Sequence, residues 1–198
     1  KGAAAGRSGL GAVMGSKRLK AVVAKGDQKS LELADRERMM AARKQHVDAL
    51  RAPGPGGGSM IDNFHTYGTS SLTAGSAHNG DTPIKNWGGV GVVDLPDVST
   101  LSGDATIENL DKRFGCWQCP IACQASLKAG TGEYKYPAGN RRPEYETQAT
   151  FGPLCLNNNK ESIAMASHIC NLYGIDTISG GCVLSLIHIS EPTRLRRI

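Results

Sequence analysis

Three cysteines close together constrain this chain more than any other feature of its sequence. Cys116, Cys119 and Cys123 stand in the stretch CWQCPIAC, with two and then three residues between them. Any disulfide scheme within this stretch leaves one thiol unpaired, and the first two cysteines are too close for an unstrained bridge. A loop that bends round one metal centre engages all three thiols. The spacing therefore predicts a metal site.

The identity of the metal follows from the ligands that the sequence does and does not provide. Soft thiolates suit both zinc and iron–sulfur clusters. A zinc site needs a fourth ligand at a short offset, and His65, His78 and His168 are all distant from the cysteines. The spacing also departs from the bacterial and plant-type ferredoxin patterns. An iron–sulfur cluster with its fourth cysteine elsewhere is favoured, and zinc is the alternative.

The composition limits the classes of protein to which the chain can belong. Its 198 residues include 25 Gly but only three Phe and two Trp, which favours a loop-rich cofactor-binding region over a compact helical bundle. The net charge is +5, yet no dense basic stripe with interleaved aromatic residues occurs, so no nucleic-acid partner is expected. No apolar run is long enough to span a bilayer, so no membrane partner is expected. Free thiols kept for a metal agree with a cytoplasmic location.

The N-terminal segment is rich in glycine and runs into a short apolar stretch, Leu19–Ala24, which we expect to form a strand. The glycine spacings miss both the dinucleotide-binding fingerprint and the P-loop. The glycines still allow the backbone to approach an anion closely, with Arg7 and Lys17 at hand. A tight-turn loop that feeds a strand explains the segment equally well.

Hydrophobic periodicity and capping residues predict that most of the remaining chain is helical. The expected helices are 34–52, 70–78, 105–114 and 158–173, the last with a capping-box-like start at Asn158 and a stop at Gly174. On that last helix Ile163, Ala166 and Cys170 share one face, so Cys170 is expected in the core. The fold class that results is α+β: a mainly α-helical chain with a short N-terminal Gly-rich loop and strand.

Two acidic residues follow Pro143 in the sequence RPEYET. Proline favours the first turn of a helix, where the helix dipole stabilises negative charge. Glu144 and Glu146 are therefore explained equally well by helix electrostatics and by catalysis.

Taken together, these stretches resemble the tungsten-dependent aldehyde:ferredoxin oxidoreductase family. The matching segments occur in the family's order and span nearly all of residues 1–183. They are Gly6–Val22 (GRSGLGAVMGSKRLKAV), Tyr67–Thr69, Ile84–Trp87, Cys116–Cys123, Arg142–Thr147 and Cys170–Gly181. Each segment alone is weak, but their combination is specific.

The resemblance implies the cofactors. A tungsten, or in some relatives a molybdenum, is held by two pyranopterin dithiolenes in that family, and a [4Fe–4S] cluster passes electrons to ferredoxin. Cys116, Cys119 and Cys123 become three of the four cluster ligands, and the fourth is expected in a C-terminal domain that this chain lacks.

The resemblance also implies which residues surround the pterin. Arg7 and the backbone of the Gly-rich loop lie near it, and a turn after the last expected helix binds it. The residues implied are Arg7, Gly9, Gly11, Asn171, Asp176 and Thr177. The family's turn carries an acid at both ends, and here the first of these acids is replaced by Asn171.

Glu146 matches a carboxylate beside the metal in the family. We expect this carboxylate to be buried, with a pKa raised by desolvation and like charge, and to shuttle a proton during catalysis. Glu144 is the structural alternative.

By this resemblance, residues 1–26 form the end of an N-terminal cofactor-cradling β domain, and residues 27–183 form the first helical domain, truncated. The stretch from Leu184 onward, LSLIHISEPTR, resembles the translation of a transposase adapter used in sequencing libraries. We therefore expect residues 184–198 not to be native, and the natural chain to continue past Val183.

The chain is thus interpreted as a fragment, inactive alone, of an enzyme that oxidises small aldehydes to carboxylic acids with ferredoxin as electron acceptor. A homo-oligomer of the intact enzyme is left open. One alternative is a relative of the aromatic acyl-CoA reductase type in the same family. Another, from a different class, is a non-catalytic iron–sulfur or zinc-binding module.

Overall fold

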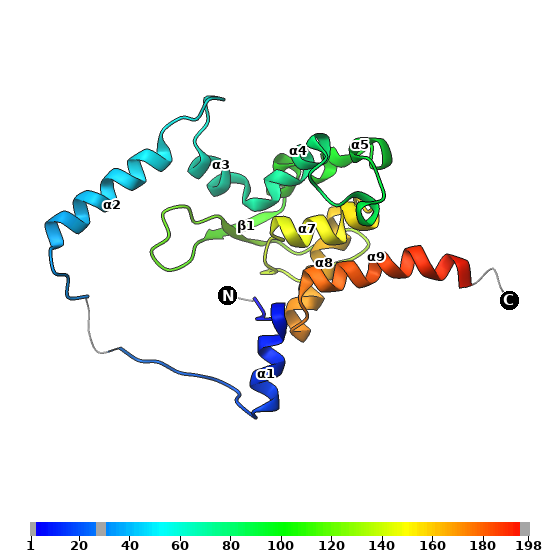
Figure 1. The fold of residues 1–198 in the computed structure, drawn as a ribbon, viewed down its shortest axis with the longest axis horizontal. Helices are drawn as coiled ribbons and strands as arrows, with labels where there is room; N and C mark the ends of the chain where they lie inside the picture. The colour runs from blue at the N-terminus through cyan, green and yellow to red at the C-terminus, as the bar shows by residue number, and fades with distance from the viewer. Residues whose placement is uncertain (1–2, 27–30, 195–198) are drawn as a thin grey trace.

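The structure, a computed structural model, describes residues 3–26 and 31–194 of the chain. It is mainly helical with one small antiparallel sheet, which confirms the α+β class (Figure 1). The α-helices are α1 (Leu10–Ser16), α2 (Arg36–Arg51), α3 (Met60–Tyr67), α4 (Leu72–Asn79), α5 (Gly91–Asp94), α6 (Gly103–Ile107), α7 (Tyr145–Phe151), α8 (Lys160–Tyr173) and α9 (Thr177–Arg194). The strands are β1 (Leu110–Phe114) and β2 (Gln124–Leu127). Short 3₁₀ helices are η1 (Arg7–Gly9), η2 (Thr69–Ser71), η3 (Ile84–Trp87), η4 (Val98–Leu101) and η5 (Pro153–Cys155).

The N-terminal strand expected at Leu19–Ala24 is not formed. This segment is irregular, and Val22 and Val23 are 76% and 89% exposed. A strand needs a neighbour to satisfy its backbone hydrogen bonds, and the one sheet of the described residues pairs only β1 with β2. The preceding Gly-rich segment is also less loop-like than expected, because α1 occupies Leu10–Ser16.

The helix expected at 34–52 is confirmed as α2, with the Asp35 side chain accepting a hydrogen bond from the Arg38 amide at 2.9 Å. No residue of α2 is buried. In Figure 1, α2 lies apart from the body formed by α4 to α9. The stability of α2 therefore depends more on its N-cap and its charged side chains than on burial.

The helix expected at 105–114 is wrong over most of its length. Helix α6 ends at Ile107, and Leu110–Phe114 forms β1 instead. This strand pairs antiparallel with β2, with Leu110 opposite Leu127 and Phe114 opposite Gln124. Long-range pairing therefore overrides the local helical pattern.

Helix α8 contributes Ile163 and Cys170 to a cluster of the hydrophobic core. Its expected stop at Gly174 is confirmed, with Gly174 in the left-handed conformation, but the N-cap is Asn159 and not Asn158. The core position of Cys170 is confirmed as well, since it packs in a cluster with Leu101, Phe151 and Ile163. This cluster fixes α8 against α7.

Helix α9 packs on α7 and then continues into the stretch expected to be non-native. Within that stretch Ser185 is buried, whereas Leu186 and Ile187 are 53% and 45% exposed. The side chain of His188 and residues 195–198 lie outside the described residues. The boundary at Leu184 stays a prediction.

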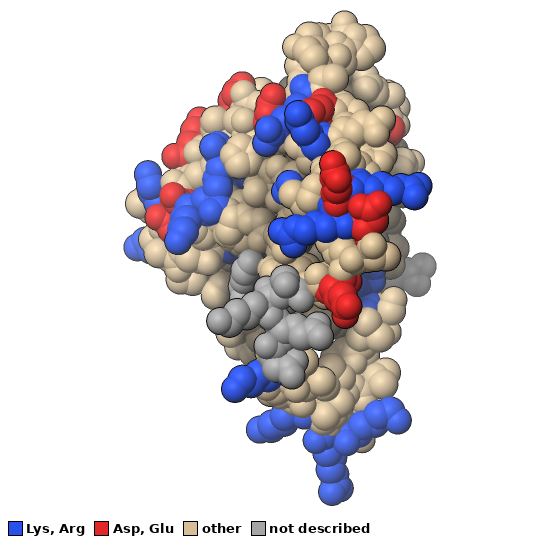
Figure 2. Space-filling view, turned by 90° about the vertical axis from the view of Figure 1, so that its left-hand side faces the viewer, with Lys and Arg blue, Asp and Glu red and all other residues tan. Residues whose placement is uncertain are grey.

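Charged side chains are spread over the surface. On the face shown in Figure 2, basic and acidic side chains are interspersed, except at the lower end, where only basic ones show. That end corresponds to the end of α1 in Figure 1, and Lys17, Arg18 and Lys20 follow there in the sequence. None of the helices in the described ranges has the length and apolar character needed to cross a membrane.

Candidate functional site

The three clustered cysteines lie on one loop that connects the two strands. The pairing of Phe114 with Gln124 closes the hairpin, so the whole stretch from Gly115 to Cys123 forms its tip. Gln118 and Ala122 adopt positive φ angles of 53° and 50°, which turn the backbone sharply after each of these residues. The sheet thus holds both ends of this cysteine loop.

The environments of the thiols differ. The backbone amides of Ala122 and Ile121 hydrogen-bond to Cys119 and lower its pKa. Burial raises the pKa of Cys123, and the nearby negative charge of Glu144 raises it further. Thiolate, the ligand form, is therefore favoured at Cys119 and disfavoured at Cys123 until a cation is bound.

The structure does not assemble the three thiols into a ready ligand set. Within residues 3–26 and 31–194, no three His, Cys, Asp or Glu side chains are arranged to hold a metal ion. The common point that the spacing predicts is therefore not formed here. The assignment of Cys116, Cys119 and Cys123 as metal ligands stays a prediction.

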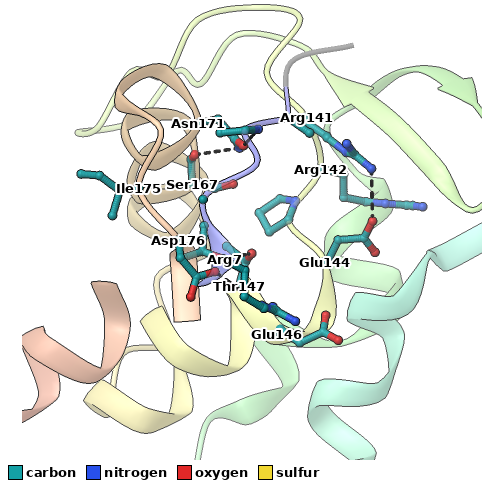
Figure 3. Close-up of a pocket in the computed structure, with 15 residues that line it drawn as sticks. Arg7, Arg141, Arg142, Glu144, Glu146, Thr147, Ser167, Asn171, Ile175 and Asp176 are labelled. Atoms are coloured by element: carbon teal, nitrogen blue, oxygen red, sulfur yellow. Dashed lines mark hydrogen bonds and ion pairs between the residues drawn. The ribbon is translucent and has the colours of Figure 1, made fainter. Parts of the chain in front are cut away.

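A cavity of about 330 Å³ is lined mainly by polar and charged residues (Figure 3). It brings together five residues that the sequence marks as functional, from the N-terminal segment, α7 and the region joining α8 to α9: Arg7, Glu146, Asn171, Asp176 and Thr177. Gly9 and Gly11, also expected at the pterin, do not line it. Gly9 is the N-cap of α1, and Gly11 lies in the first turn of that helix.

Asp176 is held firmly at the start of α9. Its carboxylate accepts hydrogen bonds from the Ser179 amide at 3.1 Å and the Ser179 hydroxyl at 2.8 Å. The Arg7 guanidinium lies 3.6 Å away. Burial alone would raise the pKa of Asp176, but the Ser179 hydrogen bonds and Arg7 outweigh it, so the net pKa is lowered. Asp176 is therefore a fixed negative charge at neutral pH.

Asn171 joins the N-terminal segment to α8. Its side-chain oxygen accepts a hydrogen bond from the Ala4 amide at 3.1 Å, and its side-chain nitrogen donates to the Ser167 carbonyl at 3.0 Å. A carboxylate at this position could accept the first bond but could not donate the second. Asparagine therefore stabilises this junction with both of its polar atoms.

The two acids of RPEYET differ in their surroundings. Glu144 accepts a hydrogen bond from Thr69 Oγ1 and pairs with Arg141 at 3.4 Å. Glu146 lies on the same side of the cavity in Figure 3, across from Asp176 and Asn171. Its side chain is exposed, so the expectation of a buried carboxylate is wrong. Glu144 is thus the structurally engaged acid, and Glu146 is the one available to a ligand.

Arg142 connects the cavity with the cysteine loop. It lines the cavity, is only 2% exposed, and donates from its guanidinium to the backbone carbonyls of Cys123 and Thr66. Its own amide donates to the Ala125 carbonyl at 2.9 Å, which places it alongside β2. The side chain lies so close to Gly68 that a Cβ there would overlap the guanidinium.

Five further residues line the cavity that were not predicted as site residues from the sequence: Gly6, Arg141, Arg142, Thr147 and Ser167. Gly6 packs on the backbone of Asp176, where a Cβ would not fit. For Arg141 and Arg142, the sequence signal of a role in the site was their position directly before the acidic segment. Nothing local distinguishes Thr147 or Ser167, because their role depends on tertiary packing.

A thiol-bearing loop tied to a polar cavity defines a candidate metal- and cofactor-binding redox region. The family described as "Aldehyde ferredoxin oxidoreductase, domains 2 & 3" matches residues 56–188. This match covers more than half of the chain. The chain therefore belongs to the aldehyde ferredoxin oxidoreductase family.

Similar curated proteins agree with this assignment. The chain is 36% identical over 196 residues to the tungsten-containing aldehyde ferredoxin oxidoreductase of Pyrococcus furiosus, covering 98% of this chain and 30% of that protein. The protein of the same name from Thermococcus kodakarensis is 35% identical over 92% of this chain and 28% of its own length. A protein of P. furiosus described as "Aliphatic sulfonate oxidoreductase, WOR-like subunit" is 30% identical over 91% of this chain and 27% of its own length. The chain thus spans less than a third of these relatives.

Proposed function

We propose that this chain is part of a tungsten-dependent enzyme that oxidises aldehydes to carboxylic acids and passes the electrons through a [4Fe–4S] cluster to ferredoxin. The observation that carries the proposal is the link through Arg142, which lines the cavity and hydrogen-bonds to the backbone of Cys123. A redox enzyme needs its reaction site and its electron carrier side by side. This connection joins the two candidate sites.

The residues of both sites fit the proposed groups in their chemistry. Cys116, Cys119 and Cys123 offer soft thiolate ligands on one loop, as a cluster requires. The cavity offers the mixed donors and acceptors that a pterin ring system and its phosphates require, with Arg7, Asp176 and Thr177 among them. When bound, the tungsten–pterin group, or its molybdenum counterpart, supplies the two-electron chemistry.

The chain's own residues orient the cofactor and move protons. Arg7 is 62% exposed at its side chain and paired on one side with Asp176, so the rest of its guanidinium can meet an anionic group. The Thr147 and Thr177 hydroxyls lie 2.8 Å apart and join α7 to the start of α9. Glu146 is exposed at the cavity, which supports a role as the acceptor of a proton when an aldehyde is hydrated and oxidised.

The domain assignment belongs to the same proposal. Residues 1–26 form the end of a cofactor-cradling β domain, residues 27–183 form most of the first helical domain, and residues 184–198 are not native. The remaining cluster ligand and the rest of the substrate pocket come from further parts of a longer cytoplasmic enzyme. The relatives' greater length agrees with this interpretation.

A second candidate within the family has some support, because one relative is described as acting on aliphatic sulfonates. The reaction of this chain's parent enzyme is therefore not fixed by its family, and reduction of an aromatic acyl-CoA is a further candidate. A non-catalytic iron–sulfur or zinc-binding module is the alternative from a different class.

Metal analysis of the complete enzyme, obtained from the gene as it continues beyond the codon for Val183, separates these candidates. Tungsten together with iron supports the proposed enzyme, and zinc alone supports the module. Assays with aldehydes, aliphatic sulfonates and aromatic acyl-CoA esters then distinguish the reactions. Aldehyde-dependent reduction of ferredoxin is the expected result.

A further inference from the structure

A second pair of thiols lies outside the cavity and the cysteine loop. Cys155 ends η5, and Cys182 lies in the second turn of α9. Both are partly buried, and both are free cysteines. Neither has a role in the function proposed above.

Close packing of α9 on α7 brings the two cysteines together. Gly181 sits so tightly against α7 that a Cβ at this position would lie 2.6 Å from Cβ of Thr150. The Cys155 thiol points into the same contact, since its Sγ lies 3.3 Å from the Thr150 carbonyl and 3.7 Å from the Gly181 carbonyl. The thiol of Cys155 is therefore aimed at the peptide that leads into Cys182.

The Cys155 thiol also lies close to the backbone of Cys182. The planar peptide holds the Gly181 oxygen about 2.8 Å from Cα of Cys182, so Cys155 Sγ is at most about 6.5 Å from that Cα. A disulfide holds its two sulfurs about 2.05 Å apart, so the two side chains must turn towards each other for the bond to form. Consistent with this proximity, the pKa of Cys155 is raised first by burial and then by the charge of Cys182.

A small oxidant can reach Cys155. Cys155 lines a cavity of about 290 Å³ that also contacts Phe151 and Ala166 and lies apart from the candidate functional site. This volume far exceeds the roughly 30 Å³ that a water molecule occupies. A molecule the size of hydrogen peroxide therefore has room beside the sulfur.

We propose that Cys155 and Cys182 form an oxidisable dithiol site, which a peroxide converts to a disulfide that fastens α9 to η5. One thiol loses its proton, and its thiolate attacks one peroxide oxygen, which breaks the O–O bond and gives a sulfenic acid. The displaced hydroxide takes up the proton and leaves as water. The second thiol then loses its proton, and its thiolate attacks the sulfenic sulfur and forms the S–S bond. The displaced hydroxide takes up this proton and leaves as a second water. Two thiols are oxidised and one peroxide is reduced to two waters.

The test uses the 198-residue chain with Cys116, Cys119 and Cys123 all replaced by Ser, which leaves Cys155, Cys170 and Cys182 as thiols. After treatment with hydrogen peroxide, remaining thiols are alkylated in denaturant and the digested protein is analysed by mass spectrometry. We expect the free thiols to fall from three to one, with a linked peptide pair that contains Cys155 and Cys182. Cys170, buried in the core, should be the thiol that remains.

Single substitutions in the same background provide the controls. Cys155→Ser and Cys182→Ser should each abolish the linked peptides, whereas Cys170→Ser should leave them unchanged. Peptide mapping of the chain with all six cysteines, run in parallel, gives the same readout if the triple variant folds poorly. Recovery of Cys155 and Cys182 as separate alkylated thiols, or their pairing with Cys170 or with another chain, would overturn the proposal.

Discussion

The guanidinium of Arg142 donates a hydrogen bond to the backbone carbonyl of Cys123, which joins the start of the acidic RPEYET segment to the end of the cysteine loop. The same guanidinium donates to the carbonyl of Thr66 at the end of α3. Two sequence segments that the resemblance assigns to different cofactors thus meet at one buried side chain. We expect this contact to hold the cysteine loop in place.

Replacement of Arg142 by Met should therefore destabilise the chain. The Cys123 carbonyl loses the guanidinium donor, and the Thr66 carbonyl keeps only the bond from Arg113, which should lower the free energy of unfolding by about 2–3 kcal/mol in urea titrations. The matched control is Arg113→Met, because Arg113 also donates to Thr66 but is exposed. An effect of Arg142→Met no larger than that of the control would show that the contact is unimportant.

Gly68 should tolerate no side chain. Its φ of 71° and ψ of −174° lie in a region essentially restricted to glycine, and a Cβ would overlap the Arg142 guanidinium. Gly68→Ala should cost about 2–4 kcal/mol, measured by thermal or urea unfolding. Gly75→Ala is the control, since Gly75 lies in α4 with open space around its Cα, and should be neutral or stabilise by up to about 1 kcal/mol. Equal stability of the two variants would contradict the described geometry.

The contribution of Asp176 to stability should depend on pH. Because its pKa is lowered in the folded chain, the stabilisation is fully present above the unfolded value of about 3.8 and is lost as the pH falls through the lowered folded pKa. Asp176→Asn should therefore reduce stability at pH 7, and its difference from the wild type should shrink towards pH 3. Ser179→Ala, which removes a bond to the carboxylate but keeps its charge, should weaken this pH dependence only in part. A difference between Asp176→Asn and the wild type that does not change with pH would argue against the ionic role.

Glu146 is predicted to act in the reaction and not in the fold. In the complete tungsten enzyme, Glu146→Gln should lower turnover by about two to four orders of magnitude with little change in tungsten content, because a proton acceptor is lost. Glu144→Gln is the comparison, since Glu144 bonds to Thr69 and Arg141 and its loss should reduce stability. Parallel loss of tungsten and turnover in Glu146→Gln would identify a structural residue, and unchanged turnover would remove it from the mechanism.

Local sequence patterns predicted those parts of the fold that depend on local interactions. The helix α2 was predicted from its local periodicity, and the end of α8 at Gly174 was predicted because a capping residue acts within one turn. The strand Leu110–Phe114 was missed because its partner lies beyond the cysteine loop. The prediction of a strand at Leu19–Ala24 was wrong because this segment has no partner strand in the described residues.

The candidate site was predictable to a similar extent. The resemblance marked Arg7, Asn171 and Asp176, and the structure brings all three to one cavity with Glu146. The sequence could not show that Asn171 uses both of its polar atoms within the chain, or that Glu146 is exposed. Both depend on how the N-terminal segment and α7 pack against α8.

The central claim is that the cysteine loop holds an iron–sulfur cluster. Anaerobic reconstitution of the 198-residue chain with iron and sulfide tests this claim most directly. Three thiols should give a cluster that is weakly bound or sensitive to oxygen, with iron content that is lost in Cys119→Ser and retained in Cys155→Ser. Iron that persists in Cys119→Ser but disappears in Cys155→Ser, or a preference for zinc over iron, would contradict the account.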